Sequence, residues 1–259
     1  ESKKYQLRGE ILSFIPVDKN VEIMLVTITN TGRMAQTVTP TAAIPLYGRS
    51  ADNIRDHRHV TSLLHRIETT DTGVLVTPTL SFDERGHQVN HMTYYCVGWS
   101  GNGEKPVDFY PTAEDFVGEG GNFERPYAIV KNAEGVKAGT RIEGLEAVGG
   151  LHFSEVTLEP EEECSYLIFT GITEDIQEIR NLSKTYTTRE MVLEELEKTK
   201  AYWQEKVNVA YHTGDSDFNQ FMHWVSFQPI LRRIYGCSFL PHHDYGKGGR
   251  GWRDLWQDC

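Results

Sequence analysis

The sequence predicts a two-part fold in which an antiparallel β-sandwich is followed by helices. Up to about residue 172 the chain alternates short runs of β-branched and aromatic residues with turn residues, which is typical of a sandwich. From about residue 187 the apolar residues recur instead at helical spacing. Separate β and α segments of this kind favour two domains joined by helices over a mixed α/β sheet.

The strand signal is carried by segments rich in Val, Ile, Thr and Tyr that end at turn residues such as Asn30-Thr-Gly. The expected strands are residues 21–29, 36–39, 73–77, 91–99 and 165–170. The segment Leu158-Glu-Pro-Glu-Glu-Glu163 predicts a turn between two strands of one sheet, because its proline and its charged cluster cannot continue a ladder.

A helix of several turns is expected after the sandwich. Thr187 and Glu190 have the spacing of a capping box, which marks a helix start. One stripe of the helix then carries, at helical spacing, Val192, Leu196, Thr199, Trp203 and Val207.

A second helix is expected to begin near Asp215-Ser-Asp217, whose side chains suit an N-cap. Its core-facing residues would be Phe218, Met222, Val225 and Ile234. Pro229 is expected to kink this helix and Gly236 to end it.

Composition excludes several classes of partner. The 259 residues include 37 acidic and 26 basic ones, a formal charge of −11, and no basic run that would track phosphates, so nucleic acid is not an expected partner. No apolar run approaches the ~20 residues of a membrane helix. Four separated cysteines form no C-x-x-C pair, so we expect no zinc knuckle and a reducing cytoplasm.

The first ten residues contain neither an initiator Met nor the pattern of a signal peptide. The chain is therefore either processed or cut from a longer protein, and we expect the second.

The glycine run near the end, Gly246-Lys-Gly248-Gly-Arg-Gly251, matches the pattern G-x-G-x-x-G of dinucleotide sites. Such a site needs a strand before the first glycine and an acidic residue about twenty positions later. Phe239-Leu-Pro-His-His-Asp-Tyr245 does not look like a buried strand, and the sequence ends at Cys259, so a nucleotide site is not indicated.

The residues after the glycines are dense in binding chemistry. They are two tryptophans, two aspartates, an arginine and a glutamine. In a helix they would form three i,i+4 pairs, which are Trp252 with Trp256, Arg253 with Gln257, and Asp254 with Asp258. Indole rings suit the apolar faces of pyranose rings, and charged side chains make strong hydrogen bonds to hydroxyls. The alternative is a buried polar network that only positions the helix.

The string GGRGWRDLWQD resembles the glycine-rich R-D-x-x-Q-D segment of the inverting glycoside phosphorylases of glycoside hydrolase family 94, of the cellodextrin and 1,2-β-oligoglucan phosphorylase type. A weaker similarity is the segment Asp115-Phe-Val-Gly118 followed by Pro126, which resembles a stretch of that family's N-terminal super-sandwich. The resemblance implies a sandwich over residues 1–180, linker helices over 181–212 and the opening of an (α/α)6 barrel over 213–259.

The resemblance also implies the site. Arg253, Asp254 and Asp258 would bind sugar hydroxyls on the non-reducing side of the cleaved bond, and Gln257 and Trp252 would support or line that pocket. The general acid is expected beyond Cys259, so no catalytic residue is expected in this chain, which alone would be inactive.

The reaction that the resemblance implies is phosphorolysis of a β-linked gluco-oligosaccharide to α-glucose 1-phosphate. Inorganic phosphate is the cosubstrate, and no metal or organic cofactor is implied. The expected partners are the oligosaccharide, phosphate and the rest of the barrel, and because some family members are dimers a homodimer is among them. The tryptophan-rich GWRDLWQD is most similar to the 1,2-β-oligoglucan and cellodextrin branches of the family, which implies β-1,2-glucan or cellodextrin substrates.

Histidine pairs offer weaker signals. His87 and His91 have metal-ligand spacing for a helix, but they lie in a strand-like stretch, so no metal site is expected. The pairs His57/His59 and His242/His243 are equally weak signals, and the charged residues 52–59 around the first pair are interpreted as a solvated loop or a helix face. For residues 52–59 the alternative is a loop that contacts sugar on the leaving side.

Two alternative functions stay open. One is a non-catalytic carbohydrate-binding sandwich, and the other is a hydrolase of the same two-domain plan that resembles bacterial glucoamylases.

Overall fold

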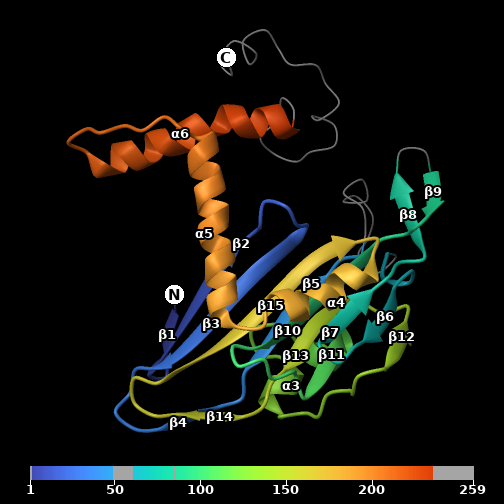
Figure 1. Ribbon diagram of the computed structural model, residues 1–259. Helices are drawn as coiled ribbons and strands as arrows, with labels where there is room; N and C mark the ends of the chain where they lie inside the picture. Colours follow the sequence, from blue (N-terminus) through green and yellow to red (C-terminus); the bar gives the residue numbers. More distant parts are fainter. Residues whose placement is uncertain (1, 49–60, 84–85, 236–259) are drawn as a thin grey trace. The chain divides into compact units, whose positions relative to one another are not determined.

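A computed structural model describes residues 2–48, 61–83 and 86–235 (Figure 1). The chain divides into two compact units, Glu1–Leu196 and Glu197–Cys259. The first unit is built mainly from antiparallel strands and the second, where described, from helices.

The first unit contains an eight-stranded sheet in which all the pairings are antiparallel. Four of the sequence-predicted strands lie side by side in it, which confirms the predictions at residues 21–29, 73–77, 91–99 and 165–170. In spatial order the strands are β1 (Ser2–Lys4), β2 (Leu7–Phe14), β3 (Val21–Asn30), β15 (Glu163–Thr173), β10 (Thr93–Ser100), β7 (Gly73–Val76), β6 (Arg66–Thr69) and β12 (Arg141–Glu143).

The remaining described strands form three smaller sheets. A three-stranded sheet has the order β11 (Asp108–Thr112), β13 (Ala147–His152) and β5 (Thr41–Leu46). Two two-stranded sheets are formed by β14 (Val156–Leu158) with β4 (Gln36–Val38), and by β8 (Leu80–Asp83) with β9 (Gly86–Val89). The predicted strand at residues 36–39 is confirmed as β4.

The turn predicted after Leu158 is present, but it joins strands of different sheets. β14 pairs with β4, whereas β15 belongs to the eight-stranded sheet, so the prediction of one sheet was wrong. The Asn30 side chain helps to hold the chain where it passes from one sheet to the other. Its amide donates hydrogen bonds to the carbonyls of Leu158 (2.9 Å) and Met34 (2.8 Å), which connects β14 to the end of β3.

The central strands of the eight-stranded sheet pack against other residues on both faces. On β3, Ile23 and Leu25 belong to one hydrophobic cluster, while Met24 and Val26 pack against another. The second cluster includes Phe109 and Leu151 of the three-stranded sheet, which therefore forms the second layer of a sandwich. The predicted β-sandwich is confirmed.

The other face of the large sheet is covered by helix α4 (Ile176–Thr185), drawn in front of the strands in Figure 1, and by the start of α5 (Arg189–Lys206). The sequence analysis did not predict α4. Its N-cap is Asp175, whose carboxylate accepts a hydrogen bond from the Gln177 N–H (2.8 Å), and its buried residues are Ile179 and Leu182.

Helix α5 begins close to the predicted position. The capping box from Thr187 to Glu190 is wrong in detail, because the Thr187 hydroxyl contacts the Met191 sulfur (3.2 Å) and the Glu190 carboxylate interacts with Thr188. Of the predicted stripe, Val192 is fully buried.

In the second unit, α6 (Ser216–Tyr235) begins as predicted, with the Asp215 carboxylate accepting hydrogen bonds from the N–H groups of Asp217 (2.9 Å) and Phe218 (3.0 Å). Phe218 and Val225 remain 45% and 37% exposed, so the prediction that they are buried was wrong for the described chain. Helical spacing identifies residues that share a face, but it does not reveal what covers that face.

Other predictions for α6 have different outcomes. Pro229 lies inside the helix as expected. Gly236, predicted to end it, lies outside the described residues.

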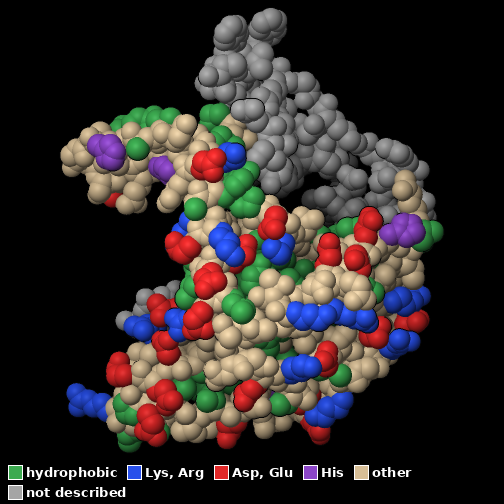
Figure 2. Space-filling model, viewed as in Figure 1, with side chains coloured by type: hydrophobic (Ala, Val, Ile, Leu, Met, Phe, Trp, Pro, Cys, Tyr) green, Lys and Arg blue, Asp and Glu red, His purple; other side chains and the backbone are tan. Residues whose placement is uncertain are grey.

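Acidic and basic side chains are interspersed over the face of the first unit seen in Figure 2, with no continuous basic patch among the described residues of that face. Among the described residues, no helix has the length and apolar character needed to cross a bilayer.

Candidate functional site

The predicted sugar-binding segment lies outside the described residues. Trp252, Arg253, Asp254, Gln257 and Asp258 all fall within residues 236–259. Residues 52–59 and His242-His243 are outside the described ranges as well. The roles assigned to these residues remain predictions.

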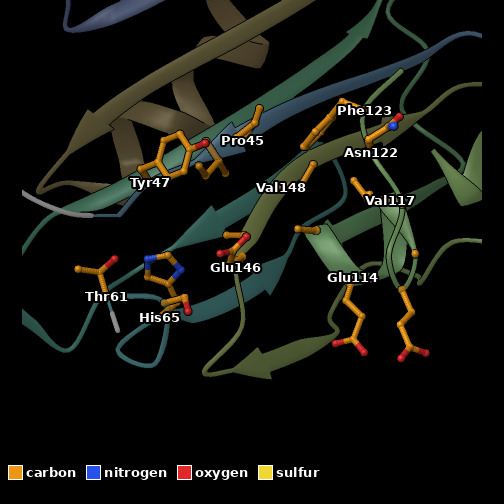
Figure 3. A pocket seen from close by; sticks show the side chains of 17 residues that line it. Pro45, Tyr47, Thr61, His65, Glu114, Val117, Asn122, Phe123, Glu146 and Val148 are labelled. Carbon is orange, nitrogen blue, oxygen red and sulfur yellow. The ribbon is translucent and has the colours of Figure 1, made fainter. Parts of the chain in front are cut away.

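Within the described chain, the sandwich contains a pocket of about 450 Å³ (Figure 3). This β5–α2 pocket is formed by the ends of β5 and β13, by the short helix α2 (Ala113–Val117), by residues 118–123 and by residues 61–65. Its volume falls within the roughly 300–1,000 Å³ of small-molecule sites.

Helix α2 is fixed at both ends. Its N-cap Thr112 accepts a hydrogen bond from the Asp115 N–H (3.0 Å) and donates one from its hydroxyl to the Asp115 carboxylate (2.7 Å). It ends at Gly118, whose φ of 80° is a conformation that glycine adopts without strain. The chain therefore turns sharply at the pocket rim.

The segment Asp115-Phe-Val-Gly118, singled out in the sequence, thus lies at this pocket. Phe116 is buried and contacts Tyr110 and Phe123, with ring centroids 5.7 and 5.9 Å apart. Pro126 is the N-cap residue of the next helix, α3 (Tyr127–Val130). The motif therefore shapes the wall of the pocket through its apolar anchor.

The floor of the pocket contains a buried histidine. His65 is 3% exposed, and its Nδ1 lies 3.1 Å from the Leu145 carbonyl, so Nδ1 carries the proton. The His65 carbonyl accepts a hydrogen bond from the Gly144 N–H (3.0 Å). These two contacts hold residues 61–65 against the turn between β12 and β13.

The pocket walls combine aromatic and polar groups. Figure 3 shows Tyr47 and Phe123 on opposite sides, with Pro45 and Val148 between them. The rings of Tyr47 and Phe123 are 47% and 48% exposed. The Asn122 side-chain oxygen accepts hydrogen bonds from the N–H groups of Glu124 (3.0 Å) and Arg125 (3.1 Å), which fixes the turn beside Phe123.

The described part of the lining carries carboxylates. Glu114, Glu119 and Glu146 line the pocket, and the lining residues that the structure describes include neither lysine nor arginine. Among the residues the structure describes, no cluster of three or more His, Cys, Asp or Glu side chains could hold a metal ion. The pocket thus offers hydrogen-bond acceptors and apolar walls.

A model of one protein family, described as the glycosyl hydrolase 94 supersandwich domain, matches residues 1–189. The chain belongs to the glycosyl hydrolase 94 family. The matched residues contain both layers of the sandwich and the whole β5–α2 pocket, so the pocket is a feature of the glycosyl hydrolase 94 supersandwich of this chain.

Two other comparisons add less. No curated protein matches the sequence. Among solved structures, a polysaccharide lyase is similar with a TM-score of 0.36 and 11% identity over 74% of this chain and 22% of that one. The chain therefore spans about a fifth of that lyase, and a likeness this low supports no statement about function.

Sequence reasoning missed the β5–α2 pocket of this glycosyl hydrolase 94 chain. Tyr47, His65, Phe123 and Glu146 come from separate segments, so no local pattern joins them. The one available signal was the Phe116-x-Gly118 segment, whose resemblance to the family's sandwich pointed to this region.

Acid is expected to destabilise the sandwich through His65. Burial lowers the pKa of His65, because loss of water outweighs the opposing influence of the Leu145 carbonyl and the Glu146 carboxylate. Below its ordinary pKa of about 6.5 the unfolded chain binds a proton that the folded chain does not. The His65 contribution to stability is thus complete above pH 6.5 and is lost as the pH falls, by at most about 1.4 kcal/mol per unit.

Urea unfolding of the wild type and of His65→Asn from pH 7.5 to pH 5 measures this effect. Asparagine keeps an N–H donor for the Leu145 carbonyl but does not titrate. We expect the wild type to lose more stability than the variant below pH 6.5. Parallel losses in the two proteins would contradict the assignment to His65.

Proposed function

We propose that this glycosyl hydrolase 94 chain is the amino-terminal part of an enzyme that phosphorolyses β-linked gluco-oligosaccharides to α-glucose 1-phosphate with inversion. The observation that supports the proposal is the order of parts along the chain. A glycosyl hydrolase 94 supersandwich over residues 1–189 is followed by helices α5 and α6 and then by the segment GGRGWRDLWQD.

In this proposal the GWRDLWQD segment binds the donor sugar. Arg253, Asp254 and Asp258 hydrogen-bond its hydroxyls, since bonds with one charged partner are roughly twice as strong as neutral ones. Gln257 and Trp252 support that pocket. The general acid is supplied by residues beyond Cys259, so this chain alone is inactive.

The proposed chemistry needs one carboxylic acid and a phosphate ion. The acid protonates the glycosidic oxygen while phosphate attacks the anomeric carbon from the opposite face, so the carbon–oxygen bond to the leaving sugar breaks as the bond to phosphate forms. The second carboxylate of an inverting hydrolase, which activates water, is then unnecessary. β-1,2-Linked or cellodextrin-type oligomers are the proposed substrates.

A non-catalytic carbohydrate-binding sandwich is the alternative from another class. The β5–α2 pocket, with its exposed rings and carboxylates, supports that alternative because it offers a binding surface without any added domain. A glucoamylase-like hydrolase of the same architecture is the third candidate.

Synthesis assays on the protein expressed from its whole gene test the proposal. α-Glucose 1-phosphate is mixed with glucose, cellobiose, laminaribiose or sophorose, and phosphate release is followed. We expect acceptor-dependent release that Asp258→Asn lowers by about 10- to 100-fold, the cost of losing a charged hydrogen bond. Asp217→Asn, on the exposed first turn of α6, is the matched control and should leave the rate unchanged.

The outcomes separate the three candidates. Phosphate release with the expected variant effect supports a phosphorylase, and the best acceptor identifies the linkage. Sugar release that does not depend on phosphate supports the hydrolase, and sugar binding without either reaction supports the binding module.

A further inference from the structure

We propose that the β5–α2 pocket of the sandwich is a binding site for a neutral stretch of the oligosaccharide, separate from the GWRDLWQD segment. The sugar class rests on the proposed function, but the site and its preference for an uncharged ligand rest on the described residues. The pocket combines three properties that sugar recognition needs: aromatic walls, oriented polar groups and a rigid frame.

The aromatic walls are Tyr47 and Phe123. Each ring is about half exposed, and the two lie on opposite sides of the pocket with Pro45 and Val148 between them (Figure 3). Single exposed aromatic residues are ordinary on a protein surface. Two rings that flank one concave, partly apolar space form a surface against which the C–H faces of a pyranose can pack.

The polar groups are carboxylates and hydroxyls. In Figure 3 the Glu146 side chain lies between His65 and Val148. Glu114 comes from α2, and its carboxylate points toward the lower edge of the view. Thr61 and Ser62 also line it. A sugar hydroxyl that donates to a carboxylate makes a short charge-assisted hydrogen bond, so a fan of hydroxyls matches this lining.

The frame of the pocket is held by contacts independent of any ligand. His65 ties residues 61–65 to the Leu145 carbonyl, the Thr112 cap and the Gly118 turn fix α2, and the Asn122 oxygen fixes the turn that carries Phe123. Walls that are already ordered lose little conformational entropy when a ligand binds.

The negative charge of the lining glutamates favours an uncharged ligand over a phosphorylated one. Among the lining residues that the structure describes, three are glutamates and none is lysine or arginine, so a phosphate group beside them would meet like charges. The pocket therefore binds an unphosphorylated sugar unit and neither inorganic phosphate nor α-glucose 1-phosphate. This preference separates it from a phosphorolytic centre, which must hold phosphate.

Isothermal titration of the 259-residue chain with sophorose, cellobiose and laminaribiose tests the assignment. We expect at least one disaccharide to bind, and both Tyr47→Ala and Phe123→Ala to weaken its association at least tenfold. Phe221→Ala, which truncates a 61% exposed ring on α6, is the matched control and should bind like the wild type. Circular dichroism and thermal unfolding verify that each variant is folded.

Two further measurements make the outcome decisive. The double variant Asp254→Asn/Asp258→Asn should leave the binding that depends on Tyr47 and Phe123 unchanged, because this site lies on the sandwich. Inorganic phosphate and α-glucose 1-phosphate should not compete. Absence of binding to all three disaccharides, or loss in the double variant with retention in Tyr47→Ala and Phe123→Ala, would overturn the site, and competition by phosphate would overturn the neutral preference.

The experiment does not depend on catalysis. If synthesis from α-glucose 1-phosphate fails while disaccharide binding requires Tyr47 and Phe123, the phosphorylase proposal is wrong and the sandwich site stands. If synthesis succeeds and the pocket variants bind normally, the reverse holds.

Discussion

The Trp99→Ala variant is expected to lose about 3–5 kcal/mol of unfolding free energy, the usual cost of removing a large buried aromatic side chain. Trp99 on β10 is 3% exposed and stacks on Phe169 of β15, with ring centroids 4.7 Å apart. Its indole N–H donates a hydrogen bond to the Tyr186 carbonyl (2.8 Å), at the C-terminal end of α4. One side chain thus joins two central strands and the helix that covers them.

Urea unfolding followed by circular dichroism measures this loss, with Trp99→Phe as the comparison. Phenylalanine keeps the stacking on Phe169 but cannot donate to the Tyr186 carbonyl, so we expect it to lose less stability than alanine. Equal losses in the two variants would show that stacking contributes little and would contradict the argument.

The Gly149→Ala variant is expected to lose about 1–3 kcal/mol or more, because the two sheets approach closely at this position. A Cβ atom on Gly149 of β13 would lie 2.2 Å from the Cys96 Cβ and 2.7 Å from its sulfur on β10. The Cys96 Cβ is fixed to the backbone and cannot rotate away, so the added methyl group must push the layers apart.

Gly9→Ala is the matched control for this variant. Gly9 also lies in a strand, β2, but a Cβ there would meet nothing within 4 Å. We expect Gly9→Ala to be neutral or slightly stabilising, since alanine reduces the entropy of the unfolded chain. The midpoints of thermal unfolding compare the two proteins, and similar losses in both would refute the close-approach argument.

The strands at the centre of the sandwich could be predicted because their signal is local. Val21–Asn30 combines β-branched residues with a turn after Asn30, and β10 and β15 have similar composition. Helix α4 has a signal too, with Asp175 before it and Ile176, Ile179 and Leu182 at helical spacing. This ten-residue helix was not predicted because it directly follows a long strand, whose pattern dominates this part of the sequence.

Other features depend on contacts that no single stretch of sequence contains. The helix α6 was predicted correctly from its own sequence, but burial of Phe218 requires contacts with other segments of the chain. The β5–α2 pocket arises from segments between residues 45 and 148, so the sandwich must form before Tyr47 and Phe123 share a cavity. The sugar-binding role of Arg253 and Asp258 stays a prediction.

The double-sided burial of the central strands has a consequence for folding accuracy. In a half-buried sheet, a strand that slips by one residue would expose its apolar side chains, and that cost specifies the register. On β10 and β15 both faces are apolar, so this penalty is weak. Side-chain size must then select the alignment, as at Gly98, where a Cβ would lie 2.7 Å from the Leu167 carbonyl oxygen. Small residues in the middle of such strands therefore help to specify the strand register. Replacing one of them with a larger residue would favour pairing in a shifted register over the native pairing.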